Sequence, residues 1–310
     1  MKSAKITMSV LVQKINTQDL TSVQQRAPGA YLGLAIGDAL GATTEFMTPS
    51  EIKFKHRQHN KITGGGWLNL KPGQVTDDTE MTLALGETII QNQAIIAEKV
   101  AESFSDWMRT KPVDIGHTVR RGIIQFRNNG TTEVPENEHD AGNGACMRCL
   151  PIALYYWNKP LVQMLQANRI QSHVTHHSPV ADAGTEAVLQ MITCALNGGS
   201  KAEMQQIADA LVEKYIIYRY DQKRQENPSG WIVETLKVVF QAFFENQSFY
   251  DILVDVVNRG GDADTTGAIA GMLAGACYGL DEIPGQWLKV LDKEVRVDCE
   301  RQALGLVGFP

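Results

Sequence analysis

Two short clusters of acidic and hydroxyl side chains have the clearest potential for chemistry in this chain. The first is Thr76-Asp77-Asp78, and the second is Asp262-Ala263-Asp264-Thr265. Each cluster precedes an apolar, helix-like pattern, and the first cluster taken alone is best explained as a helix N-cap. Capping needs only one side chain, however, whereas each cluster carries two aspartates and a threonine. Four carboxylates that met in one fold would repel one another unless cations neutralised them.

The ligand type indicates which cations these are. Carboxylate and hydroxyl oxygens are hard ligands, which suit Mg²⁺ or Mn²⁺ better than zinc. An EF-hand is excluded, because the acidic residues are not spread along a calcium-binding loop with a closing glutamate. The sequence therefore predicts two divalent cations held between the clusters. This prediction requires the two distant segments to meet in the folded chain.

A further carboxylate, Glu45, follows the glycine-rich residues 33–41. At the end of a helix its side chain would project into a cleft, so we include it among the candidate catalytic residues. Asp38 lies within the same stretch, and we interpret it as a structural acceptor for loop N–H groups. Trp67 follows three consecutive glycines; it could pack in the core or contact a protein substrate, and we favour core packing.

The elements that would position these residues have helical patterns. Apolar residues recur at spacings of three and four in four separate segments, whereas alternation with a period of two is scarce. Residues 180–196 add a long apolar segment rich in alanine. The sequence predicts a compact, single-domain all-α fold. The residues that form the four stripes are Tyr31, Leu32, Ala35, Ile36 and Ala39; Met81, Leu85, Thr88 and Ile89; Val100, Phe104 and Trp107; and Ile232, Leu236, Val239 and Phe240.

Small residues recur every three or four positions between Gly267 and Gly275. Such a stripe lets two helices pack at short range, and the resulting stiffness would hold metal ligands in place. The glycines at 64–66 and 260–261 indicate loops with positive φ or with a close backbone approach. Residues 267–280 are the most membrane-like segment, but they are too short to span a bilayer and are predicted to form a buried helix.

Polar, irregular residues 1–27 are predicted to form a loosely attached arm, and residues 28–310 the folded domain, with Pro28 in the first turn of its first helix. The net charge is −6 and no run of Lys or Arg stands out, so nucleic acid is an unlikely class of partner by charge.

Five cysteines indicate reduced thiols in a cytoplasmic protein. Cys146 and Cys149 have a redox or zinc spacing, but no second pair accompanies them, and the segment is predicted to be a helix packed with apolar neighbours.

Five segments, in this order, resemble the ADP-ribosylglycohydrolase family. They are GAYLGLAIGDALGATTEF, TGGGWLNLKPGQVTDDTEMTLALG, DAGNGACMRCLP, THHSP and NRGGDADTTGAIAGMLAGACYG. The resemblance covers about residues 28–300. It implies a compact all-α fold with a binuclear Mn²⁺ or Mg²⁺ centre in a cleft. The implied activity is hydrolysis of the N-glycosidic bond that joins ADP-ribose to an arginine of a protein.

The resemblance also assigns roles to individual residues. It makes Asp140 a second candidate catalytic carboxylate in addition to Glu45. It also assigns Asn143 and Gly144 to a loop that contacts the substrate. This loop has two interpretations, a solvated loop or a mobile rim that closes over ADP-ribose. His176 matches a histidine on the substrate side. The residues that match the family's metal-binding motif are Thr76, Asp77, Asp78, Asp262, Asp264 and Thr265.

The resemblance implies ADP-ribosylated nitrogenase iron protein as the target. The alternatives are another ADP-ribosyl-arginine target, such as one modified by a toxin, and a binuclear phosphoesterase. A non-catalytic binding protein is disfavoured because all six predicted ligands are present. The implied partners are a PII-type signalling protein and an ammonium channel, which would bring the cytoplasmic protein reversibly to the membrane without a transmembrane segment. A monomer is expected.

Overall fold

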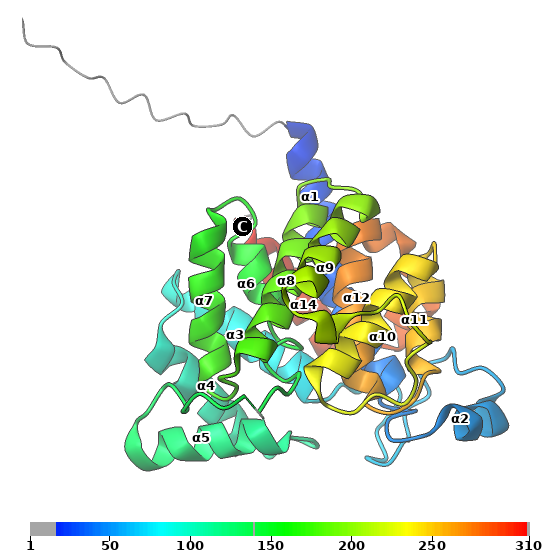
Figure 1. The fold of residues 1–310 in the computed structure, drawn as a ribbon, viewed down its shortest axis with the longest axis horizontal. Coiled ribbons are helices and arrows are strands. Elements are labelled where there is room, and N and C mark those ends of the chain that lie inside the picture. The colour runs from blue at the N-terminus through cyan, green and yellow to red at the C-terminus, as the bar shows by residue number, and fades with distance from the viewer. Residues whose placement is uncertain (1–16, 139, 309–310) are drawn as a thin grey trace, which may run out of the picture.

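A computed structural model describes residues 17–138 and 140–308 (Figure 1). These residues form helices and connecting loops, and among them we find two isolated bridges, Gly65 to Leu70 and Gly142 to Trp231, but no strand of a sheet. The predicted all-α class is therefore confirmed. The helices, in chain order, are α1 (Thr17–Gly41), α2 (Pro49–His56), α3 (Asp77–Asn92), α4 (Ala97–Arg109), α5 (His117–Asn129), α6 (Leu150–Tyr155), α7 (Leu161–His173), α8 (Pro179–Leu196), α9 (Lys201–Lys214), η1 (Ile216–Tyr218), α10 (Ile232–Glu245), α11 (Phe249–Val257), α12 (Ala263–Tyr278), η2 (Leu280–Glu282), α13 (Gly285–Val290) and α14 (Lys293–Leu306).

Helices α1 and α12 form the central pair of the fold (Figure 1). Glycines at every fourth position of α1 face small residues at every fourth position of α12. A Cβ atom added to Gly37 would lie 2.0 Å from the carbonyl oxygen of Gly267, so the two backbones are in direct contact. The predicted short-range packing is confirmed, and α1 is the partner. The facing pairs are Gly29 and Gly275, Gly33 and Gly271, Gly37 and Gly267, and Gly41 and Ala263.

The other helices surround this pair and supply the core. Helices α8, α10 and α11 pack against α12, while α3 and α14 pack against α1. Helix α12 is buried from Ala263 to Ala276, as predicted for the most apolar segment. None of the described helices has both the length and the apolar character that crossing a bilayer requires.

The folded domain begins earlier in the chain than the sequence predicts. Helix α1 starts at Thr17, and Pro28 lies inside it instead of in its first turn. Val23 and Ala27 are buried, and the Arg26 guanidinium donates to two carbonyl groups near the end of α12. The polar composition of this stretch obscured its one buried face. The predicted arm is therefore wrong for residues 22–27, and residues 1–16 lie outside the described residues.

The two closely spaced cysteines, Cys146 and Cys149, are free thiols without access to solvent. They lie in the turns that precede α6 rather than in a helix. Burial raises the pKa of Cys149 well above its usual range. A redox cysteine needs a lowered pKa and some exposure, so these residues act as small core side chains.

Candidate metal centre and active site

The two acidic clusters meet where α3 and α12 begin. The hydroxyl group of Thr265 donates a hydrogen bond to Oδ2 of Asp78, with an oxygen–oxygen distance of 3.3 Å. Asp77 and Asp264 line the same cleft. The glycine contacts between α1 and α12 end at Gly41 and Ala263, directly beside this point. The close packing of the central helices therefore brings the clusters together, as the sequence analysis required.

Helix capping does not account for the clusters. Thr76 and Asp262 are the N-cap residues of α3 and α12, but neither side chain accepts a hydrogen bond from a helix N–H group. Instead, Asp38 accepts from the backbone N–H groups of Thr76, at 3.0 Å, and of Thr79, at 3.1 Å. Asp38 thus has the structural role predicted for it, and it caps α3 in place of the cluster carboxylates.

A cleft of about 410 Å³ opens onto the cluster residues. It contains eight of the predicted site residues, while Thr76 and Asp78 are completely buried behind it and Asp140 lies outside its lining. Gly260 and Gly261 (φ of 71° and 64°) make the turn into α12, and a Cβ atom on either would lie 2.1 Å from a backbone oxygen. The predicted residues that line the cleft are Glu45, Asp77, Asn143, Gly144, His176, Asp262, Asp264 and Thr265.

Asp140, which the family resemblance suggested as catalytic, points to a different set of partners. Its carboxylate forms an ion pair with Arg121 and accepts a hydrogen bond from the Asn137 side chain at 3.0 Å. The chain turns inward only after Asp140, so that Asn143 and not Asp140 reaches the cleft. Glu45 is the predicted catalytic carboxylate that does line it.

Glu45 is held by a tryptophan that the sequence analysis interpreted differently. Trp67 donates from its indole Nε1 to Oε2 of Glu45 at 2.6 Å. Trp67 is 51% exposed and its ring lies 5.3 Å from that of Phe46, so the prediction of core packing is wrong. The reason is the preceding loop: a Cβ atom on Gly66 would lie 2.3 Å from the carbonyl oxygen of Ala42. This contact places the loop on the end of α1 and leaves Trp67 at the cleft.

Burial raises the pKa values of the site carboxylates. Burial is the largest cause for Glu45, whose pKa rises to about 8; the Trp67 hydrogen bond opposes this rise, and the charges of Asp262 and Asp114 add to it. Burial, and then the charge of Asp114, raise the pKa of Asp77 to about 8. Burial and neighbouring carboxylates also raise the pKa of Asp264 well above its usual range. The site is therefore an acidic cluster without enough nearby positive charge.

The donor set fits divalent cations. Glu45, Asp114 and Asp264 each present a carboxylate oxygen within 4.8 Å of the others. The Oδ1 atom of Asp78 is buried and has no hydrogen-bond partner among the described residues. Hard oxygen donors in this number are the ligands that Mg²⁺ and Mn²⁺ prefer. Asp114 was not predicted, because it lies in a loop whose only sequence signal is its position between Pro112 and Gly116.

Asn143 reaches the cleft from the loop that precedes α6. Its side-chain amide donates to Oδ2 of Asp262 and to Oγ1 of Thr235, the latter at 2.9 Å. Its backbone N–H donates to the carbonyl oxygen of Gly230 at 2.9 Å. Asn143 is only 7% exposed, so the interpretation of residues 142–144 as a solvated loop is wrong.

His176 is fixed in one orientation beneath this loop. Arg148 donates to Oγ1 of Thr175 at 2.7 Å, so the Thr175 hydroxyl is free to donate to Nδ1 of His176, 2.8 Å away. With the Thr175 hydroxyl as the donor, Nε2 of His176 carries the ring proton. Burial, and then the charges of Arg148 and Arg121, lower the pKa of His176 to about 3. A Cβ atom on Gly144 would lie 2.7 Å from this ring, which explains the glycine.

Known proteins are similar to this chain over nearly its whole length. A family model described as ADP-ribosylglycohydrolase matches residues 19–308. An "ADP-ribosyl-[dinitrogen reductase] glycohydrolase" from Rhodospirillum rubrum is 44% identical over 93% of this chain and 97% of the relative. An "ADP-ribosylarginine hydrolase Tri1" from Serratia proteamaculans is 31% identical over 88% of this chain and 76% of the relative. A solved structure titled "ADP-ribosylglycohydrolase-related protein complex" superposes with a TM-score of 0.82 and 33% identity, covering 93% of this chain and 98% of its own.

Proposed function

The chain belongs to the ADP-ribosylglycohydrolase family, and from that premise we propose that it removes ADP-ribose from a modified arginine of a protein. Dinitrogenase reductase, the nitrogenase iron protein, is the first candidate target. The support is the identity of 44% with a relative whose printed name specifies that substrate and whose length is matched almost completely. The observation that carries the proposal is the convergence of Glu45, Asp77, Asp262 and Asp264 on one cleft.

We propose that the cleft holds two divalent cations, Mn²⁺ or Mg²⁺. Asp77, Asp78, Asp262 and Asp264 would supply most of the ligands, together with Thr76 and Thr265, and Glu45 and Asp114 lie close enough to add to them. When bound, the cations supply the positive charge that binds and orients the ribose hydroxyl groups of an anionic substrate. Their charge also offsets the repulsion among the carboxylates, which explains why so many acids are buried together.

Glu45 is the first candidate for the residue that moves a proton. The bond between the ribose anomeric carbon and the guanidinium nitrogen breaks, water oxygen bonds to that carbon, and a water proton replaces the sugar on nitrogen. Glu45 would take the proton from water or deliver one to the nitrogen, and the Trp67 N–H fixes its orientation. Asp140 stays a second candidate, but it reaches the cleft only if its ion pair with Arg121 opens.

Asn143 and His176 would contact the substrate. The Asn143 amide is already committed to Asp262, so its main effect is to orient that carboxylate. His176 is neutral, and its Nε2–H group is available as a donor from the floor of the cleft. Closure of residues 142–144 as a rim remains a prediction.

A second candidate target is another ADP-ribosylated arginine. The similarity to the Serratia relative favours it, because that protein's name specifies ADP-ribosylarginine without a particular substrate. Incubation of the protein and Mn²⁺ with ADP-ribosylated dinitrogenase reductase, and with unrelated proteins modified on arginine, serine or glutamate, separates these cases. Release of free ADP-ribose from the reductase alone supports the first target, and equal release from all arginine substrates supports the second. Release of phosphate in place of ADP-ribose would favour a binuclear phosphoesterase.

The proposed partners beyond the substrate rest on the family resemblance. They are a PII-type signalling protein and an ammonium channel, with a cytoplasmic monomer that binds the membrane reversibly through them. Co-purification from cells before and after an ammonium pulse, with and without the PII protein, tests the association. Recovery of the same complexes in both conditions would contradict regulation of this kind.

A further inference from the structure

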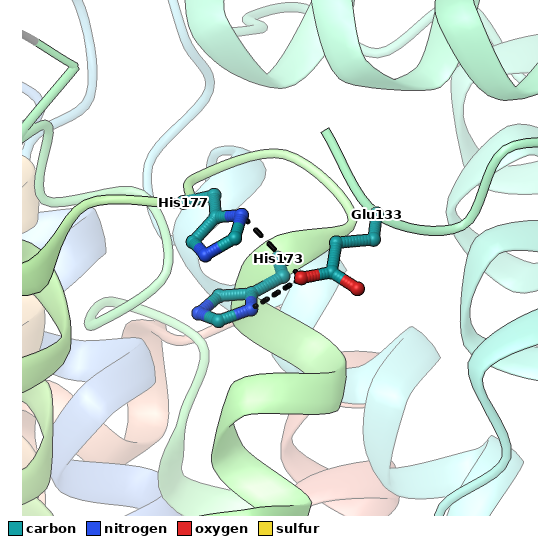
Figure 2. A group of neighbouring side chains, drawn as sticks. All are labelled: Glu133, His173 and His177. Atoms are coloured by element: carbon teal, nitrogen blue, oxygen red, sulfur yellow. Dashed lines mark ion pairs between the residues drawn. The ribbon is translucent and has the colours of Figure 1, made fainter. Parts of the chain in front are cut away.

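A second group of metal-ligating side chains lies outside the cleft (Figure 2). It consists of Glu133, from the segment between α5 and α6, His173, the last residue of α7, and His177, which precedes α8. The two imidazole rings are stacked, with centroids 3.7 Å apart and planes inclined by 20°. We call this group the Glu133 cluster. None of its three residues lines the cleft.

Two distances within the Glu133 cluster match those between the ligands of a tetrahedral metal site. Oε1 of Glu133 lies 3.4 Å from Nδ1 of His173 and 3.5 Å from Nδ1 of His177. Figure 2 shows this single oxygen facing a nitrogen of each ring. Zinc binds nitrogen and oxygen ligands at roughly 2.0–2.2 Å, which separates tetrahedral ligand atoms by about 3.4 Å. Both ring nitrogens therefore lie at the ligand–ligand distance from one carboxylate oxygen, and a shared metal requires the stacked rings to turn so that both lone pairs point to it.

The surroundings of His173 prepare its Nδ1 atom for a metal. Oδ2 of Asp182 lies 2.9 Å from Nε2 of His173, so the ring proton of the neutral imidazole is held on that side. Nδ1 then faces the carboxylate oxygen of Glu133. In the metal-free protein a proton satisfies this pair, because, against the opposing effect of burial, Asp182 and Glu133 raise the pKa of His173, and a metal ion would replace that proton. A carboxylate that binds the distal N–H group of a histidine is a recurring feature of metal sites. The other oxygen of Asp182 is buried without a hydrogen-bond partner among the described residues.

The backbone around the Glu133 cluster is already in place. The N–H group of Val134 donates to the carbonyl oxygen of His173 at 2.8 Å, and the N–H group of Asn137 donates to that of His177 at 2.9 Å. Nδ1 of His177 also lies 2.9 Å from the carbonyl oxygen of Val134. In the metal-free protein a proton on this nitrogen bridges the two atoms, and a metal would displace that proton into solvent.

We propose that Glu133, His173 and His177 form a binding site for a transition-metal dication of the Zn²⁺ class. Two imidazoles and one carboxylate suit such a cation, whereas Mg²⁺ prefers oxygen ligands alone. Three protein ligands leave the fourth position for water. The bound cation would link the segment between α5 and α6 to the end of α7. The first of these segments continues to Asn143, and His176 follows the second. The cation would thus stabilise the two segments that line the cleft without contacting the substrate.

Zinc titration of the full-length protein tests this proposal. The protein is stripped with a chelator, saturated with Mg²⁺ to occupy the cleft, and titrated with Zn²⁺ by calorimetry. The wild-type protein should bind zinc at a site that survives Asp264→Asn and is lost in His173→Gln. Asp182→Asn should weaken the same site by about 10–100-fold, because it removes the carboxylate that orients His173. Zinc affinity should fall as the pH is lowered, since protons compete for Nδ1.

Substitutions at exposed residues test zinc binding without disturbing the fold. Glu133 is solvent-exposed, so Glu133→Gln should weaken zinc binding without loss of helical structure. Glu138→Gln removes an exposed carboxylate from the same segment and should leave zinc affinity unchanged. Failure of the wild-type protein to bind zinc under these conditions would overturn the proposal, and so would equal zinc affinity in wild type, His173→Gln and Glu133→Gln. Either result would mean that the cluster binds protons only.

Discussion

The hydroxyl group of Thr265 lies 3.3 Å from a carboxylate oxygen of Asp78, although 187 positions separate the two residues in the chain. This contact joins the first turns of α3 and α12 and gathers the acidic residues of both around one cleft. It depends on the glycine contacts between α1 and α12, which leave no space for side chains between the helices. The packing of the central helices and the chemistry of the cleft are therefore coupled.

The glycine contacts should be intolerant of even one added methyl group. A Cβ atom in Gly37→Ala would lie 2.0 Å from the carbonyl oxygen of Gly267, so the two helices must separate. Overpacking of this kind costs about 1–3 kcal/mol or more, which exceeds the gain in helix propensity. Denaturant unfolding should show this loss of stability, together with weaker binding of divalent cations. Gly305→Ala in α14 is the matched control: its Cβ atom would lie 3.5 Å from Ile90, so stability should stay the same or rise. Equal stability changes in the two variants would contradict backbone contact at Gly37.

The stability of the metal-free protein should fall as the pH rises. Folding raises the pKa of Asp77 from 3.8 to about 8 and that of Glu45 from 4.5 to about 8. Between these limits the folded state retains protons that the unfolded state has lost, so this stabilisation is complete at acidic pH and disappears towards about pH 8. Thermal unfolding in chelator should therefore show a lower midpoint at about pH 8 than at about pH 5. Added Mg²⁺ or Mn²⁺ should raise the midpoint more at the higher pH, where protons no longer compete. A cation effect independent of pH would argue against binding by these carboxylates.

Removal of the Glu45 carboxylate should reduce turnover strongly. Glu45→Gln retains the shape of the side chain and an acceptor for Trp67, but it cannot accept a proton. A general acid–base group contributes about 10²–10⁴-fold to rate, and the loss of kcat should fall in this range. Asp140→Asn should cost far less, because Asp140 is bound to Arg121 outside the cleft. ADP-ribose release under saturating substrate measures both variants, and a larger loss for Asp140→Asn would reverse the two assignments.

Trp67 should act as a positioning residue for Glu45. Trp67→Phe keeps an aromatic ring beside Phe46 but removes the indole N–H group. That hydrogen bond lowers the pKa of Glu45, so its loss should raise the pKa further. The limb of the pH–rate profile that reports Glu45 should move to higher pH, with a smaller loss of kcat than in Glu45→Gln. A reduced rate with an unmoved pH profile would mean that Trp67 serves only the shape of the cleft.

The predicted parts of this molecule are those with local signals. Spacings of three and four in residues such as Val100, Phe104 and Trp107 identified buried helix faces, because that periodicity reflects one side of a helix. The glycine repeat after Asp264 predicted close helix packing for the same reason. Both acidic clusters were visible because unusual residues stood next to one another.

The residues that escaped prediction depend on long-range geometry. Asp114 reaches Glu45 and Asp264 from a loop without a motif, so only the folded chain reveals it. Trp67 looked like a core aromatic, but the contact of Gly66 with the end of α1 directs it to the cleft. Asp140 was chosen by family resemblance, whereas its ion pair with Arg121 follows from the packing of α5 against the next loop. The buried face of residues 22–27 was hidden among polar residues.

Divalent-cation binding by Asp264→Asn, compared with the wild-type protein, tests the central claim most directly. Asp264 belongs to the second cluster and lies within reach of Glu45 and Asp114, and the substitution removes charge with little change in volume. Calorimetric titration of the chelator-treated proteins with Mn²⁺ should show binding in the wild type and its loss in the variant, with matching helical circular dichroism spectra. Undiminished Mn²⁺ binding and full release of ADP-ribose by Asp264→Asn would contradict a metal centre in this cleft.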